Sequence, residues 1–154
     1  MSDPKTRYHA HGVTAPGGEA RITTLAATIP FDGSPTMGEE VPGPAHLLAS
    51  ALAACVLKNV ERFSHMMPFK YSAAAVDVVL ERQESPPRIV RATYTLEVDT
   101  DEPRARCQLL HRNITKFGTI SNTLARACEL SGTTRVRRSG GSVEELDPPA
   151  SGEG

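Results

Sequence analysis

The sequence predicts an α+β domain in which antiparallel strands pack against mostly buried helices. Five stretches have the alternating apolar pattern or β-branched content of strands, and three have apolar residues spaced by three and four, as in helices. They follow one another in the order ββ–α–ββ–αα–β, which is typical of α+β folds. With 154 residues, 39% of them apolar, the chain is long enough to bury a core.

The first two strands are expected at residues 8–15 and 20–30. A Pro16-Gly17-Gly18 turn separates them, and the second stretch is rich in β-branched threonine and isoleucine. These features predict an N-terminal hairpin.

A helix is predicted to begin at Pro44, after a loop rich in glycine and proline. Proline suits the first turn of a helix, where its missing N–H costs nothing. The apolar positions of this helix are Leu48, Ala51, Leu52, Cys55, Val56, Val60 and Phe63. Because residues 47–56 include no charged side chain, the helix must be covered on several sides. One sheet covers one side, so we expect a second subunit to cover another, in a homodimer.

The next two strands form the clearest hairpin of the sequence. Apolar and polar residues alternate from Tyr71 to Gln83 and again from Val90 to Asp99, on either side of a Ser85-Pro86-Pro87 turn.

Two further helices and a strand complete the predicted fold. The second helix opens at Glu102-Pro103 and ends or bends at Gly118. The third helix runs to Cys128, and Gly132 stands where a left-handed stop is favoured. Its candidate N-caps are Thr119 and Ser121. A short strand is expected over residues 133–138.

The composition of the two ends predicts little structure there. Residues 1–6 are polar, and residues 139–154 are rich in glycine, serine, proline and acidic side chains. We therefore expect a flexible N-terminus at 1–6, a single domain over 7–138 and a disordered tail over 139–154.

Charge, apolar runs and cysteine content argue against nucleic-acid binding, membrane insertion and secretion. The net charge is −1 and the basic residues are scattered, which argues against nucleic acid. No apolar run approaches the roughly 20 residues of a membrane span, and the start of the chain lacks a signal-peptide core. An odd number of cysteines, three, does not suit a secreted disulfide framework. These observations predict a cytoplasmic protein.

No cofactor or metal is predicted. His9 and His11 share one strand face, but no third ligand stands at a suitable spacing, so we interpret them as solvated side chains. The sequence has no phosphate-binding loop. His46 lies in the first turn of the Cys55 helix, where it could line the mouth of a pocket without reaching Cys55.

Two segments resemble the OsmC/Ohr family of osmotically inducible and organic hydroperoxide resistance proteins. They are Gly43 to Cys55, which reads GPAHLLASALAAC, and Lys116 to Leu124, which reads KFGTISNTL. With the strand pair between them, the resemblance covers about residues 15–138. It implies an intertwined α+β homodimer, and many members are thiol peroxidases that reduce organic hydroperoxides between subunits.

The resemblance also assigns residues. Cys55 matches the peroxidatic cysteine, whose thiolate attacks the O–O bond and becomes a sulfenic acid. The family's resolving cysteine matches Gly118, and the glutamate that holds an activating arginine matches Ala45. The resemblance therefore implies a divergent member without the resolving thiol. Arg21 is the best candidate for the arginine, with Glu39 or Glu40 as residues that could orient it.

Two functions remain open at this point. In the first, Cys55 reduces an organic hydroperoxide in a one-cysteine cycle that an external thiol completes. In the second, the protein is not catalytic and binds a small apolar ligand in a pocket between subunits. Cys55 would then be a core residue, because free cysteine often packs as a small hydrophobe. Cys107 and Cys128, on apolar helix faces, are interpreted as core residues in either case.

Overall fold

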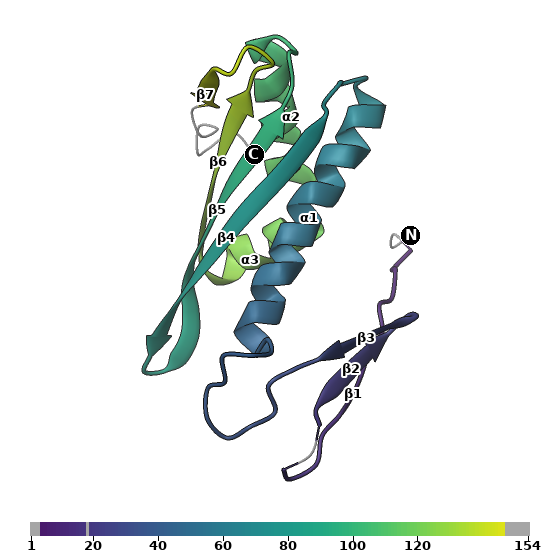
Figure 1. Ribbon diagram of the computed structural model, residues 1–154, viewed down its shortest axis with the longest axis vertical. Coiled ribbons are helices and arrows are strands. Elements are labelled where there is room, and N and C mark those ends of the chain that lie inside the picture. The colour runs from purple at the N-terminus through teal and green to yellow at the C-terminus, as the bar shows by residue number, and fades with distance from the viewer. Residues whose placement is uncertain (1–3, 18, 147–154) are drawn as a thin grey trace. The chain divides into compact units, whose positions relative to one another are not determined.

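The computed structural model describes residues 4–17 and 19–146 (Figure 1). The chain divides into two compact units, residues 1–48 and 49–154, where the sequence predicts a single domain over 7–138. Each unit is described by itself below.

The N-terminal unit contains an antiparallel sheet of three strands, β1 (His11–Val13), β2 (Arg21–Thr24) and β3 (Ala27–Pro30), in that order. The sequence predicts two strands here, because the stretch over 20–30 reads as continuous. The chain instead reverses at Leu25, which has a positive φ of 50°, and Thr24 pairs with Ala27 across a two-residue turn. Leucine and alanine are not typical turn residues, so the sequence does not signal this reversal.

Little of the N-terminal unit is buried. Among its described residues only Ala20 belongs to the core, at 7% exposure, whereas Leu25 is 99% exposed and Met37 82%. This part of the chain therefore has almost no hydrophobic core of its own.

Helix α1 (Pro44–Met66) starts at the predicted proline and runs from the first unit into the second. Its buried residues recur at helical spacing and are Leu52, Val56, Asn59, Val60 and Phe63. The period of the sequence is thus confirmed, and one buried position is polar.

The C-terminal unit contains a four-stranded sheet in the order β4 (Ala73–Glu84), β5 (Pro87–Asp99), β6 (Glu129–Arg137) and β7 (Val143–Leu146) (Figure 1). Strands β4 and β5 form the predicted antiparallel hairpin. Strand β6 pairs with β5 in parallel, although the sequence predicts antiparallel strands throughout. The reason is that two helices lie between β5 and β6. They carry the chain back to the end of the sheet at which β5 begins, so that β6 runs in the same direction as β5.

Those two helices, α2 (Arg104–Phe117) and α3 (Thr119–Ala127), are separated by Gly118 alone. Gly118 is both the C-cap of α2 and the N-cap of α3, in an extended conformation, and it is buried. The predicted break at Gly118 is confirmed. Capping of α3 by Thr119 or Ser121 is wrong, because both residues lie inside the helix and no side chain caps it.

Gly132 has a different role from the predicted helix stop. It lies within β6, directly opposite Tyr94 of β5. A Cβ atom on Gly132 would lie 1.9 Å from Cζ of Tyr94, so the aromatic ring occupies the space of the missing side chain. Helix α3 ends instead at Ala127, where Cys128 turns to extended backbone.

The C-terminal region is more ordered than its composition predicts. Strand β7 pairs with β6, and Leu146 is only 1% exposed. Glu144 forms ion pairs with Arg104 and Arg138. The predicted disordered tail is therefore wrong for residues 139–146, while 147–154 lie outside the described residues. At the other end, residues 1–3 also lie outside them, and 4–6 have no regular structure.

Candidate functional site

Cys55 is a free, half-buried cysteine in the C-terminal unit, about three turns into α1. One turn further along the same face lies Asn59, which is 7% exposed. Its Nδ2 donates a hydrogen bond to Sγ of Cys55 over 3.7 Å. A buried amide is thus directed at the sulfur.

Gly118 lies directly against the same sulfur. A Cβ atom on Gly118 would lie 3.1 Å from Sγ of Cys55 and 2.8 Å from Oγ of Ser121. The position that the resemblance assigns to a second cysteine is therefore in contact with Cys55. The structure therefore brings positions 55 and 118 together, and glycine at position 118 has no side chain to offer the sulfur.

Ser121 occupies the first turn of α3 and is 3% exposed. In the part of the chain that the structure describes, its hydroxyl has no hydrogen-bond partner. The sequence suggests Ser121 only as a helix cap, and no local signal marks it as a site residue. Asn59 was also missed, although a polar residue four positions after Cys55 on an apolar helix face is a visible signal.

Tyr94 approaches this group from β5. Burial raises the pKa of its phenol, a hydrogen bond with Thr115 opposes that effect, and the charge of the nearby Cys55 raises it further. The phenol oxygen lies 3.5 Å from Oγ1 of Thr115.

Two phenylalanines pack together about two turns of α1 beyond Cys55, one of them buried and one half-exposed. Phe117 directly precedes Gly118, is 47% exposed, and has its ring centroid 5.7 Å from that of Phe63 on α1.

The other residues that the resemblance singles out lie at the start of α1 or before it. Ala45 is in the first turn of α1, ten residues before Cys55. Arg21 is exposed on β2 and lines a cavity of about 470 Å³ together with Asp32. Among the described residues it forms no ion pair with Glu39 or Glu40.

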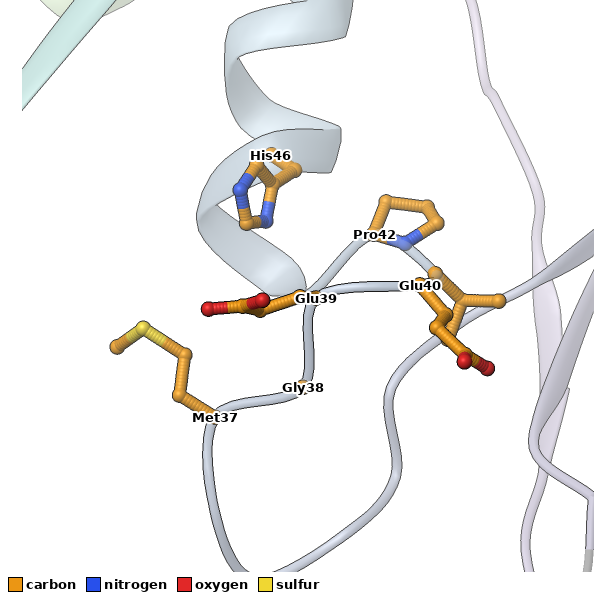
Figure 2. Close-up of a pocket in the computed structure, with 7 residues that line it drawn as sticks. Met37, Gly38, Glu39, Glu40, Pro42 and His46 are labelled. Atoms are coloured by element: carbon orange, nitrogen blue, oxygen red, sulfur yellow. The ribbon is translucent and has the colours of Figure 1, made fainter.

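Glu39 and Glu40 line a different cavity, of about 610 Å³, together with Met37 and His46 (Figure 2). His46 thus lines a pocket, as the sequence predicts, and its Nδ1 accepts a hydrogen bond from the backbone N–H of Gly43 over 3.1 Å. Figure 2 shows Glu40 pointing away from His46.

The remaining cysteines are engaged with backbone carbonyls. Cys107 is 2% exposed, and burial raises the pKa of its thiol. Its Sγ contacts the carbonyl oxygen of Glu102, and Sγ of Cys128 contacts that of Leu124.

Within residues 4–17 and 19–146, no group of three or more histidine, cysteine or acidic side chains is arranged to hold a metal ion. None of the helices described there is long and apolar enough to cross a membrane.

These features define an α+β protein whose central helix presents a half-buried cysteine to the junction of two later helices. The model of the OsmC-like protein family matches residues 37–131, and the chain belongs to this family. No curated protein matches the sequence.

Solved structures share the fold at low sequence identity. An OsmC-like protein from Mycoplasma pneumoniae is 16% identical with a TM-score of 0.75, covering 88% of this chain and 99% of its own. The organic hydroperoxide resistance protein OhrB of Bacillus subtilis is 18% identical with a TM-score of 0.58, covering 84% and 98%. The organic hydroperoxide resistance protein OsmC from Legionella pneumophila is 12% identical with a TM-score of 0.64, covering 87% and 98%.

Proposed function

We propose that the protein is a one-cysteine thiol peroxidase that reduces organic hydroperoxides at Cys55. The observation that carries the proposal is the environment of the sulfur, which is half-buried, hydrogen-bonded to a buried amide and in contact with Gly118. Membership of the OsmC family supports it, as do the two similar structures described as organic hydroperoxide resistance proteins.

The proposed reaction begins with attack of the Cys55 thiolate on the terminal oxygen of the hydroperoxide. The S–O bond forms as the O–O bond breaks, so the sulfur is oxidised to a sulfenic acid and the peroxide is reduced. The alkoxide that leaves takes up a proton and departs as an alcohol. The exposed ring of Phe117 supports an organic rather than an inorganic peroxide as the substrate.

The reduced cysteine is then regenerated by external thiols. Gly118 offers no sulfur, so a small thiol attacks the sulfenic acid, forms a mixed disulfide and releases water. A second thiol attacks the mixed disulfide, releases the oxidised reductant and restores Cys55. Such a cycle suits a reducing compartment such as the cytoplasm.

We further propose that the working form is an intertwined homodimer. The N-terminal unit buries only Ala20 among its described residues, so its strands need a surface on which to pack. A second copy of the chain would supply that surface, and the N-terminal unit would bring Arg21 to it as the candidate activating cation.

The alternative is a non-catalytic protein that binds a small apolar ligand between subunits. It is favoured by the two departures from the family pattern, Ala45 and Gly118.

One experiment separates the two functions. The purified protein is given cumene hydroperoxide with dithiothreitol, and peroxide consumption is followed for the wild type, Cys55→Ser and Cys128→Ser. The proposal requires that Cys55→Ser abolish consumption and that the control Cys128→Ser retain it. Equal rates in the wild type and Cys55→Ser would contradict the peroxidase, and a retained small molecule in native mass spectra would then favour ligand binding.

A further inference from the structure

We infer that Asn59 and Ser121 are catalytic hydrogen-bond donors to the sulfur of Cys55. The Asn59 amide would stabilise the thiolate, and the Ser121 hydroxyl would hold the oxygen of the sulfenic acid. This inference rests on the proposed peroxidase function and names the groups that serve it within the C-terminal unit.

The case for Asn59 starts from its burial. It is 7% exposed on α1, among residues that are otherwise apolar on that face. A buried amide costs free energy unless its N–H groups are hydrogen-bonded. Its hydrogen bond is made to Sγ of Cys55, over 3.7 Å. The amide is therefore a fixed donor aimed at the reacting atom.

A donor in this position favours the charged form of the sulfur. Hydrogen bonds to ionised groups are roughly twice as strong as those between neutral groups. The thiolate therefore gains more from the Asn59 amide than the thiol does. This difference is what a peroxidatic cysteine needs, because only the thiolate attacks the peroxide.

The case for Ser121 rests on its position across Gly118. Oγ of Ser121 and Sγ of Cys55 both lie within 3.1 Å of the point where a side chain on Gly118 would begin. Ser121 is 3% exposed, and its hydroxyl has no hydrogen-bond partner among the described residues. An oxygen atom added to the sulfur on this side comes towards an unused donor. With no thiol at position 118, the sulfenic acid stays on Cys55 until an external thiol attacks it.

The test compares Asn59→Leu and Ser121→Ala with a matched control. Asn113→Leu is suitable because the Asn113 amide also contacts a sulfur, Sδ of Met67 over 3.8 Å, on a different part of the fold. The rate of Cys55 alkylation by iodoacetamide is measured from pH 6 to 10 in a background where Cys107 and Cys128 are serine. Asn59→Leu should slow alkylation at pH 7 by about threefold, because the loss of one hydrogen bond to the thiolate is partly offset by the greater nucleophilicity of the sulfur without it. At pH 10 Asn59→Leu should no longer be slower than the wild type, and Asn113→Leu should follow the wild type throughout.

Ser121→Ala is tested on the second step. After one equivalent of cumene hydroperoxide, the sulfenic acid is trapped with dimedone at increasing delays, and its lifetime should be several-fold shorter than in the wild type. Asn59→Ala is carried in parallel, so that a folding defect of the leucine variant does not decide the outcome. Wild-type alkylation profiles in a folded Asn59 variant, or a wild-type sulfenic acid lifetime in Ser121→Ala, would overturn the inference. Failure of the proposed function gives a different result from failure of this inference. The wild type itself would then form no sulfenic acid, whereas the alkylation rates of the wild type and the Asn59 variants could still be compared.

Discussion

Cys55 and the backbone of Gly118 are in direct contact, since a Cβ atom on Gly118 would lie 3.1 Å from Sγ of Cys55. In a disulfide, Cβ of one cysteine lies about 3.0 Å from Sγ of the other, as its bond lengths require. One of the distances that a disulfide requires is therefore already met at position 118.

Gly118→Cys should consequently form a disulfide with Cys55. Oγ of Ser121, 2.8 Å from that Cβ, ends a short side chain and can rotate away, whereas Cβ of Ser121, at 3.2 Å, must shift slightly. After mild oxidation with diamide, thiol titration in denaturant should find that Cys55 and the new thiol have been lost and that Cys107 and Cys128 remain. Gly118→Cys in a Cys55→Ser background is the control and should keep all its thiols. A Gly118→Cys protein that also keeps all of them would contradict the geometry.

Gly132→Ala should destabilise the protein. The added Cβ would lie 1.9 Å from Cζ of Tyr94, so the buried ring must move, and overpacking of this kind costs about 1–3 kcal/mol or more. Urea unfolding measures the loss, and Gly140→Ala, with no atom within 4 Å of its Cβ, should be close to neutral. The effect of Gly132→Ala should shrink when Tyr94 is already leucine, and an undiminished effect would mean that the ring is not its cause.

Stability should fall when the pH drops below about 6.5, because of His111. This side chain is 3% exposed, its Nδ1 hydrogen-bonds to the Thr134 hydroxyl, and its Nε2 has no partner among the described residues. Burial lowers the pKa of the imidazole below its ordinary value of 6.5. The unfolded chain then binds the proton more readily than the folded protein does. The free energy of unfolding is therefore at its full value above about pH 6.5 and falls as the pH drops below it.

The slope should reach up to about 1.4 kcal/mol per pH unit for a single proton. Urea unfolding between pH 5 and 8 measures it, and the double variant His111→Leu with Thr134→Val should have a flatter profile. The carboxyls of Asp101 and Glu144 do not interfere, because hydrogen bonds lower their pKa values and their stabilisation is lost only in more acidic solution. An unchanged slope in the double variant would assign the effect to other groups.

Leu146→Ala should cost about 2–5 kcal/mol, as is usual for a fully buried leucine. Val143, on the same strand, is 56% exposed, so Val143→Ala should have a much smaller effect. Thermal unfolding of both variants tests whether β7 belongs to the folded unit. Equal small effects would contradict the burial of Leu146 and favour the disorder that the composition predicts for this region.

Cys107 should resist modification in the native protein. It is 2% exposed, and burial raises the pKa of its thiol, so both access and thiolate content are low. Brief iodoacetamide treatment followed by peptide mass spectrometry should find Cys55 labelled before Cys107. Labelling of Cys107 first would mean that α2 opens more readily than its burial implies.

The parts of the fold that depend on local signals could be predicted from the sequence. Pro44 marks the start of α1, the alternation around Pro86 marks the β4–β5 hairpin, and Gly118 marks the break between α2 and α3. The parallel pairing of β6 could not be predicted, because it depends on where two helices return the chain. Gly132 was misinterpreted for the same reason, since its partner Tyr94 is distant in the sequence.

The candidate site divides in a similar way. Cys55 and Gly118 were found through a resemblance that spans both segments, and the structure places them in contact. Asn59 has a signal in the sequence, as a polar residue four positions after Cys55 on an apolar helix face, whereas Ser121 lies near Cys55 only through the fold of α3 after Gly118. The relation of Arg21 to Cys55 stays a prediction.

The packing of Tyr94 against Gly132 also links β6 to the chemistry of α1. The ring has the strand backbone behind it, and its hydroxyl end carries the electrostatic interaction with Cys55. Any side chain at position 132 would displace the ring away from β6 and carry the phenol to a new place relative to the sulfur. The size of residue 132, on a strand that lies far along the chain from α1, therefore governs where the phenol of Tyr94 lies.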